Sequence, residues 1–164
     1  MFIPGILITI LTFPGVIIHE LGHKIFCNLM GVPVLQVKYF RFGNPAGYVI
    51  HEPAKKFSQT FMITVGPFIV NTLLSFLTFV IAVLSGGNYL FLWLGASIGM
   101  HSFPSTGDAK SLWSESKRHL KHSAFALIGF PFAILIFIGS ILSIFWFDLI
   151  YAAMLYFLAS ALFV

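Results

Sequence analysis

The chain has 164 residues, of which 59% are hydrophobic and only 9% carry a charged side chain. A soluble domain carries about 25% charged residues, so this composition excludes an ordinary soluble protein and predicts a multi-spanning membrane protein. A single cysteine, Cys27, excludes an internal disulfide and a structural zinc site built on cysteines. The net charge of +4 comes from basic residues scattered over short polar connections, which indicates membrane topology signals and no nucleic-acid binding.

The first apolar segment runs from Phe2 to Met30. It has no charge between Phe2 and Ile18, no basic start and no small-residue cleavage site, so we expect a membrane helix and not a cleaved signal peptide. Pro14–Gly15 predicts a kink inside this helix. Gly31 followed by Pro33 predicts its end.

An H-E-x-x-H pattern lies in this segment at His19, Glu20 and His23. On a helix the two histidines share one face, which is the spacing for binding one metal ion, and the glutamate can activate a water on that ion. At 1.5 Å per residue they lie about 18 and 12 Å from the helix end at Gly31, which is below the membrane surface. Polar groups at that depth are costly and need a functional reason, and Lys24 must reach the interface or a water-filled cavity.

The next stretch has a strand pattern. Val34–Phe42 is rich in β-branched and aromatic residues, Gly43–Gly47 is a turn cluster, and Tyr48–Ile50 resumes the pattern. We therefore expect a small interfacial β-hairpin over Val34–His51. Two roles stay open for it: pairing of its edge with an extended peptide, or an ordinary interfacial element.

Further apolar segments follow at Ser58–Ser85, Tyr89–Phe103, Ser123–Phe145 and Leu149–Val164, with a polar loop or short helix at Lys110–His122. Tyr89–Phe103 has only fifteen residues, against about 20 for a full span, so irregular backbone that lines a cavity is expected at its end. The predicted fold is an all-α membrane protein of about five transmembrane or membrane-embedded helical segments with the hairpin after the first. We expect a single domain over residues 1–164, without a PDZ or other accessory domain.

The basic residues indicate the topology. Five of the nine precede the second span and four lie between the third and the fourth, so alternate spans would place all of them on one side: Lys24, Lys38, Arg41, Lys55, Lys56, Lys110, Lys117, Arg118 and Lys121. The turns at Ser85–Asn88 and Trp146–Asp148 contain none. The positive-inside rule then predicts an outer N-terminus, a cytosolic C-terminus and a site that opens to the cytosol. We expect a prokaryotic cell membrane, because the chain is small and shows no targeting signal.

A catalytic zinc ion usually has three protein ligands and one open position, so a third ligand is needed. Asp108 is the candidate, because it is the first acidic residue after Glu52 and follows the short apolar segment. The alternative is that Asp108 caps the polar stretch that follows it. The competing ligands are Cys27, His51, Glu52 and His101, whereas His119 and His122 are expected to be solvated.

Two further polar residues are candidates for substrate or oxyanion support. Asn71 can hydrogen-bond a substrate carbonyl or hold the active-site loop, or it can form an ordinary interhelical hydrogen bond. His101 can donate to the oxyanion or to a ligand carboxylate, or it can cap the end of the short segment.

With these residues the chain resembles the site-2 protease group of intramembrane zinc metalloproteases. The resemblance rests on His19–His23, on Gly66–Pro67 with Asn71, and on Pro104–Asp108, and it covers the chain from about Pro4 to Lys110. It implies one zinc ion bound by the two motif histidines and a distal aspartate, with the motif glutamate as general base. It also implies cleavage of membrane-embedded protein substrates near the cytosolic side.

The chain departs from the family's usual distal motif, N-x-x-P-x-x-x-x-D-G. His101 stands in the place of the asparagine, Ala109 in that of the glycine, and the gap between Pro104 and Asp108 is one residue shorter. The chain therefore looks like a minimal, divergent member.

The expected activity is that of a zinc-dependent intramembrane endopeptidase whose partners are a membrane protein substrate and the lipid bilayer. The alternative is a non-proteolytic membrane metal-binding protein or pseudo-protease that uses the same residues. A transporter is disfavoured, because the last two apolar segments carry almost no polar side chains beyond Ser140 and Ser143.

Overall fold

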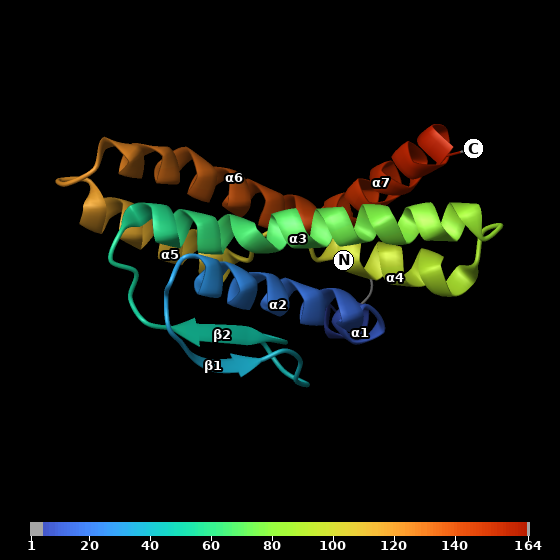
Figure 1. The fold of residues 1–164 in the computed structure, drawn as a ribbon, viewed down its shortest axis with the longest axis horizontal. Helices are drawn as coiled ribbons and strands as arrows, with labels where there is room; N and C mark the ends of the chain where they lie inside the picture. Colours follow the sequence, from blue (N-terminus) through green and yellow to red (C-terminus); the bar gives the residue numbers. More distant parts are fainter. Residues whose placement is uncertain (1–4, 164) are drawn as a thin grey trace.

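The computed structural model describes residues 5–163, which form helices and one two-stranded sheet (Figure 1). The α-helices are α1 Gly5–Leu11, α2 Phe13–Leu29, α3 Phe57–Leu84, α4 Tyr89–Met100, α5 Thr106–His119, α6 Gly129–Leu142 and α7 Phe147–Phe163. Two 3₁₀ helices, η1 Ala124–Ile128 and η2 Ser143–Phe145, flank α6. Helix α3 is the longest, at 28 residues, and α2, α4, α5 and α7 all pack against it.

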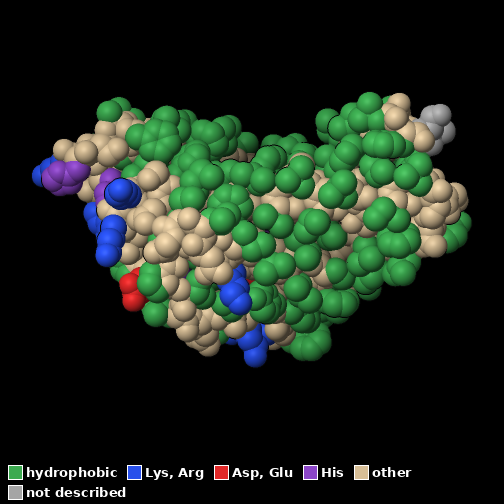
Figure 2. All heavy atoms as spheres, viewed as in Figure 1, with side chains coloured by type: hydrophobic (Ala, Val, Ile, Leu, Met, Phe, Trp, Pro, Cys, Tyr) green, Lys and Arg blue, Asp and Glu red, His purple; other side chains and the backbone are tan. Residues whose placement is uncertain are grey.

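The exterior is strongly apolar. Helix α3 and the stretch Ala124–Phe145 are each long and apolar enough to cross a membrane, and α4 and α7 are apolar but shorter. Figure 2 shows hydrophobic side chains over most of the visible face, whereas Lys and Arg gather at the α5 end and at the hairpin. An apolar surface of this extent would be covered by lipid or by a partner.

The first segment is broken, but not where the sequence predicts. The chain turns at Thr12, between α1 and α2, and Pro14 lies in the first turn of α2. A proline is accommodated there because the first turn of a helix has no intrahelical acceptor for its N–H groups. The predicted end is confirmed: α2 stops at Leu29, and Gly31 follows with φ +66°.

The predicted hairpin is confirmed, with shorter strands. Strand β1, Val34–Lys38, pairs antiparallel with β2, Tyr48–His51. Residues 39–47 leave the sheet and fold back over α2, where the Tyr39 hydroxyl lies 3.2 Å from the Lys24 ammonium that donates to it. Strand β1 thus ends at Lys38, before Phe42, and the contact gives Lys24 a polar partner.

The short fourth helix ends as expected in irregular backbone. Helix α4 stops at Met100, and residues 101–105 connect it to α5. The polar stretch after them is a regular helix, because Ser105 caps it by accepting from the N–H of Asp108 at 3.2 Å.

The turn at residues 146–148 does not reverse the chain. Trp146, with φ 63°, redirects the backbone straight into α7, so α6 packs on α5 whereas α7 packs on α3 and α4 (Figure 1). The last turns of α7 then share a surface pocket with the α3–α4 turn, through Tyr156, Phe157 and Gly86 among others. Helix α7 therefore does not run back along α6, and its last turns lie beside the α3–α4 turn and away from the basic end of the molecule.

Helices α2 and α3 approach closely at Gly22, where an added Cβ would lie 2.8 Å from the Pro67 Cα. We expect Gly22→Ala to lower the apparent melting temperature in detergent, since overpacking costs about 1–3 kcal/mol and outweighs the gain of about 1 kcal/mol in helix propensity. The matched control is Gly139→Ala in α6, where a Cβ meets no described atom of another element within 4 Å. That variant should be unchanged or more stable, and equal stability of the two variants would contradict the close approach.

Candidate metal centre

Two helices supply three side chains that could hold a metal ion: His19 and His23 from α2, and Asp108 from the first turn of α5. Their ligand atoms all lie within 4.8 Å of one another. The Nε2 of His23 is 3.4 Å from Asp108 Oδ1, and the Nε2 of His19 is 4.0 Å from Asp108 Oδ2. The structure thus brings together the three residues that the sequence analysis singled out as ligands.

Backbone carbonyls orient both histidines. The Nδ1 of His19 is 2.7 Å from the carbonyl oxygen of His101, and the Nδ1 of His23 is 3.0 Å from that of Ile63. A carbonyl oxygen can only accept, so each ring carries its hydrogen on Nδ1. Each Nε2 is then free to bind a metal ion, which is the usual arrangement around metal-binding histidines.

Asp108 combines the two roles that the sequence left as alternatives. Its Oδ2 accepts from the backbone N–H of Ser105 at 2.7 Å and from the Ser105 hydroxyl at 2.6 Å, which completes a capping box. Its Oδ1 is turned toward His23. Burial raises the pKa of the Asp108 carboxyl, but the neighbouring histidines and Ser105 outweigh it and hold that pKa well below its usual range. The group is therefore a carboxylate, the form that binds a metal ion.

Glu20 lies beside the three ligands and lines the same cavity of about 700 Å³. Its side chain is buried beneath the hairpin connection: a Cβ added at Gly47 would lie 2.6 Å from the Glu20 Cγ and 2.9 Å from its Oε1. Only glycine leaves room for the carboxylate at this point. The hairpin connection thus forms one wall of the cavity.

The donor set suits a catalytic ion. Two imidazole nitrogens and one carboxylate oxygen are ligands that zinc accepts, and three protein ligands leave a position open for water or substrate. Iron(II) uses the same combination of two histidines and a carboxylate. The described residues contain no other group of three His, Cys, Asp or Glu side chains that could hold an ion.

Asn71 lies in α3, away from the cavity, and is fully buried. Its Nδ2 lies 3.1–3.2 Å from three backbone carbonyls, those of Gly15, Ile98 and His101, and so joins α2, α3 and the end of α4. The His101 carbonyl is the same one that accepts from His19. The interhelical hydrogen bond expected as one alternative for Asn71 is present, and it supports the loop that orients a ligand. All described hydrogen bonds of Asn71 go to backbone carbonyls, and Asn71 does not line the cavity.

His101 has one ring nitrogen engaged. Its Nε2 is 2.8 Å from the Thr12 hydroxyl, which in turn lies 2.6 Å from the Ile8 carbonyl. Because the hydroxyl donates its one hydrogen to Ile8, the His101 Nε2 donates to Thr12. The imidazole therefore fastens the α1–α2 break to the end of α4, and the backbone carbonyl of His101 is what contacts His19.

The competing ligands do not belong to the group that could hold an ion, although His51 and His101 line the same cavity. Cys27 is fully buried in an apolar cluster with Phe26 and Ile63, and the Nδ1 of His51 is 2.7 Å from the carbonyl of Glu52. His119 is the last residue of α5 and lies 3.4 Å from Glu115, so it is not a solvated loop residue as expected.

Sequence reasoning missed the carbonyls of Ile63 and His101 and the contact of Gly47 with Glu20. A backbone carbonyl carries no side-chain signal, so only the packing of α3 and α4 against α2 reveals it. Gly47 was recognised as part of a turn cluster, but the sequence holds no sign of what lies beneath it.

Comparison with protein-family models, with curated proteins and with solved structures finds no match to this chain. The geometry of the site and the motif spacing therefore carry the functional argument.

We expect Asn71→Ala to weaken zinc binding about 10–100-fold, because loss of an outer contact that orients a ligand has effects of this size. Competition with a chromophoric chelator measures the affinity. The control is Ser75→Ala, which removes another fully buried donor of α3, bonded to the Gly95 carbonyl at 2.8 Å and with no link to His101. Equal affinities of the two variants would contradict the positioning role.

The two roles of Asp108 can be separated by variants. Asp108→Ala should abolish stoichiometric zinc, measured by elemental analysis of purified protein, because it removes a ligand. Ser105→Ala removes the cap and keeps the carboxylate, so it should cost about 1 kcal/mol of stability and retain the ion. Full zinc occupancy in Asp108→Ala would show that another group is the third ligand.

Proposed function

We propose that this chain is a zinc-dependent intramembrane endopeptidase similar to the site-2 protease group. The observation that carries the proposal is the convergence of His19, His23 and Asp108 within 4.8 Å. It is supported by the free Nε2 atoms of both histidines and by Glu20 in the same cavity. A chance H-E-x-x-H would have no reason to meet a distant carboxylate in this way.

When bound, a zinc ion acts as a Lewis acid that polarises the scissile carbonyl and makes water more acidic. The Glu20 carboxylate would take the proton from the attacking water and deliver it to the leaving amine. Gly47 packs against one side of the Glu20 side chain, which would limit its contact with bulk water on that side, while the carboxylate still borders the cavity. His19, His23 and Asp108 would hold the ion, and the carbonyls of His101 and Ile63 would keep the rings aligned.

The substrate would be a membrane protein segment in an extended or locally unwound form, because helical hydrogen bonds shield a scissile peptide. Tyr48 and Val49 of β2 line the cavity, so a strand edge is close to the ligands. A strand edge offers N–H and C=O groups that can bind an extended peptide. The hairpin is thus suited to substrate binding in addition to covering Glu20.

The proposed membrane orientation keeps the basic end of the molecule, at α5 and the hairpin, on the cytosolic side. The α3–α4 turn would then lie on the outer side. Because the last turns of α7 adjoin that turn, the C-terminal end of α7 would also lie outside, contrary to the expectation from the sequence. The site would still open toward the basic, cytosolic side.

One observation favours a second function, that of a non-proteolytic metal-binding protein. The residue-39–47 connection packs directly against Glu20, so the room for a polypeptide beside the carboxylate is limited unless the hairpin is displaced. A protein that only binds an ion would have no need for such a displacement.

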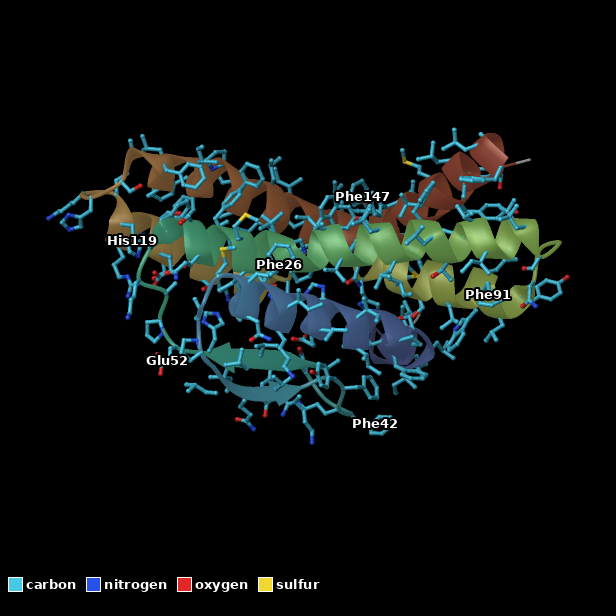
Figure 3. The ribbon with its side chains drawn as sticks, viewed as in Figure 1. Phe26, Phe42, Glu52, Phe91, His119 and Phe147 are labelled. Atoms are coloured by element: carbon cyan, nitrogen blue, oxygen red, sulfur yellow. The ribbon has the colours of Figure 1, made fainter. Side chains whose placement is uncertain are left out.

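Glu20→Gln distinguishes the two functions. We expect it to retain one zinc ion and to lose cleavage by about 10²–10⁴-fold, because glutamine keeps the shape and cannot accept the proton. The assay would use internally quenched peptides with apolar, membrane-type sequences in detergent micelles, with Glu52→Gln on the exposed end of the hairpin as control (Figure 3). Cleavage by Glu20→Gln at the wild-type rate would overturn the mechanism.

A further inference from the structure

A single carboxylate interrupts the apolar C-terminal third of the chain. Asp148 is the only charged residue between positions 123 and 163. It lies in the first turn of α7, directly after the redirected backbone at Trp146. The last two apolar segments carry few polar side chains, but the junction between them carries a carboxylate.

Asp148 has no counter-ion. Its Oδ1 accepts from the N–H of the adjacent Leu149 at 3.0 Å, and no Lys, Arg or His of the described residues forms an ion pair with it. An unpaired ionisable group among apolar helices is costly and is retained for a function by default. Asp148 is not the N-cap of α7, because an N-cap side chain accepts from an N–H two or three residues further along, although the helix dipole favours a carboxylate in this first turn.

Asp148 lines the cavity that also contains the candidate metal centre. The lining includes His19, Glu20, His23 and Asp108, together with Ser140 of α6 and Ser143 of η2. In Figure 2 the upper outline of the molecule dips where α6 meets α7. Phe147, labelled in Figure 3, marks this junction and is the residue before Asp148. The lining of the cavity thus includes residues of the hairpin and three polar residues from α6, η2 and α7, namely Ser140, Ser143 and Asp148.

We propose that Asp148, with Ser140 and Ser143, forms a subsite that binds a basic side chain of the substrate, from a lysine or arginine near the scissile bond. A cation placed beside an unpaired carboxylate is stabilised by the charge and removes the cost of leaving that carboxylate alone. The long apolar stem of lysine or arginine suits the cavity wall formed by Met100 and Phe103. The Ser140 hydroxyl donates to the Ile136 carbonyl at 3.0 Å, so its oxygen is left to accept from the cation.

This inference deepens the proposed function and rests on it. The first measurement is the cleavage of internally quenched peptides that differ only by Lys, Gln or Glu at one position at a time. Wild type should prefer Lys to Gln about tenfold or more at one position near the scissile bond, since hydrogen bonds to charged groups are worth about 1.5–3 kcal/mol. Asp148→Asn should remove that preference and keep cleavage of the Gln peptide, whereas Asp148→Lys should prefer Glu there.

The second measurement does not depend on catalysis. Zinc-loaded Glu20→Gln should bind the Lys peptide about tenfold more tightly than the Gln peptide by fluorescence anisotropy. The double variant with Asp148→Asn should bind both equally, and the double variant with Glu52→Gln should keep the difference. If wild type cleaves nothing but the binding difference is seen, the endopeptidase proposal fails and the subsite stands. An unchanged Lys preference in Asp148→Asn, in cleavage or in binding, overturns the subsite.

Discussion

The candidate centre depends on one backbone carbonyl, that of His101. It accepts from the ring of His19 and from the amide of Asn71, and it exists as a free acceptor only because α4 ends at Met100. In a continuous helix this carbonyl would bond to an N–H four residues further on and could not orient a ligand. The break between α4 and α5 is therefore what makes a metal centre compatible with an apolar helical bundle.

The rest of the network keeps that break in place. The Nδ2 of Asn71 also bonds to Gly15 and Ile98, and the Ser97 hydroxyl accepts from the Gly15 N–H at 3.0 Å and donates to the Thr12 carbonyl at 2.9 Å. These bonds tie the irregular start of α2 to the irregular end of α4. The Oδ1 of Asn71 is left buried with no hydrogen-bond partner in the described part of the chain, which is a cost that native structures rarely accept. The amide is turned this way because three carbonyls surround its nitrogen.

Much of the fold and of the candidate site follows from the sequence, and the reasons differ from element to element. The H-E-x-x-H spacing depends only on helix geometry, and Gly31 and Pro33 are strong local signals, so α2 and its end were predictable. Asp108 was found because acidic residues are so few that one beside a broken apolar segment is conspicuous. The course of α7 was not predictable, because Trp146 adopts a left-handed conformation that no local pattern announces, and a turn without glycine or proline reads as a reversal as readily as a bend.

The proposed hydrolytic activity inside an apolar bundle also needs water, and the lining of the cavity suggests how the chain could supply it. Beside the candidate ligands its lining includes the hydroxyls of Thr60, Thr64 and Ser111, which come from α3 and α5. Polar groups of this kind can hold water where apolar walls would leave the space dry. They lie on the two helices whose ends carry most of the basic residues, so the wet part of the cavity faces the proposed cytosolic side. The carboxylate of Asp148 lies at the junction of α6 and α7, where the lining is apolar apart from Ser140 and Ser143. The cavity therefore combines two kinds of wall. Water could reach Glu20 from the polar wall, whereas the mainly apolar wall with the charge of Asp148 is the one suited to a membrane-embedded peptide.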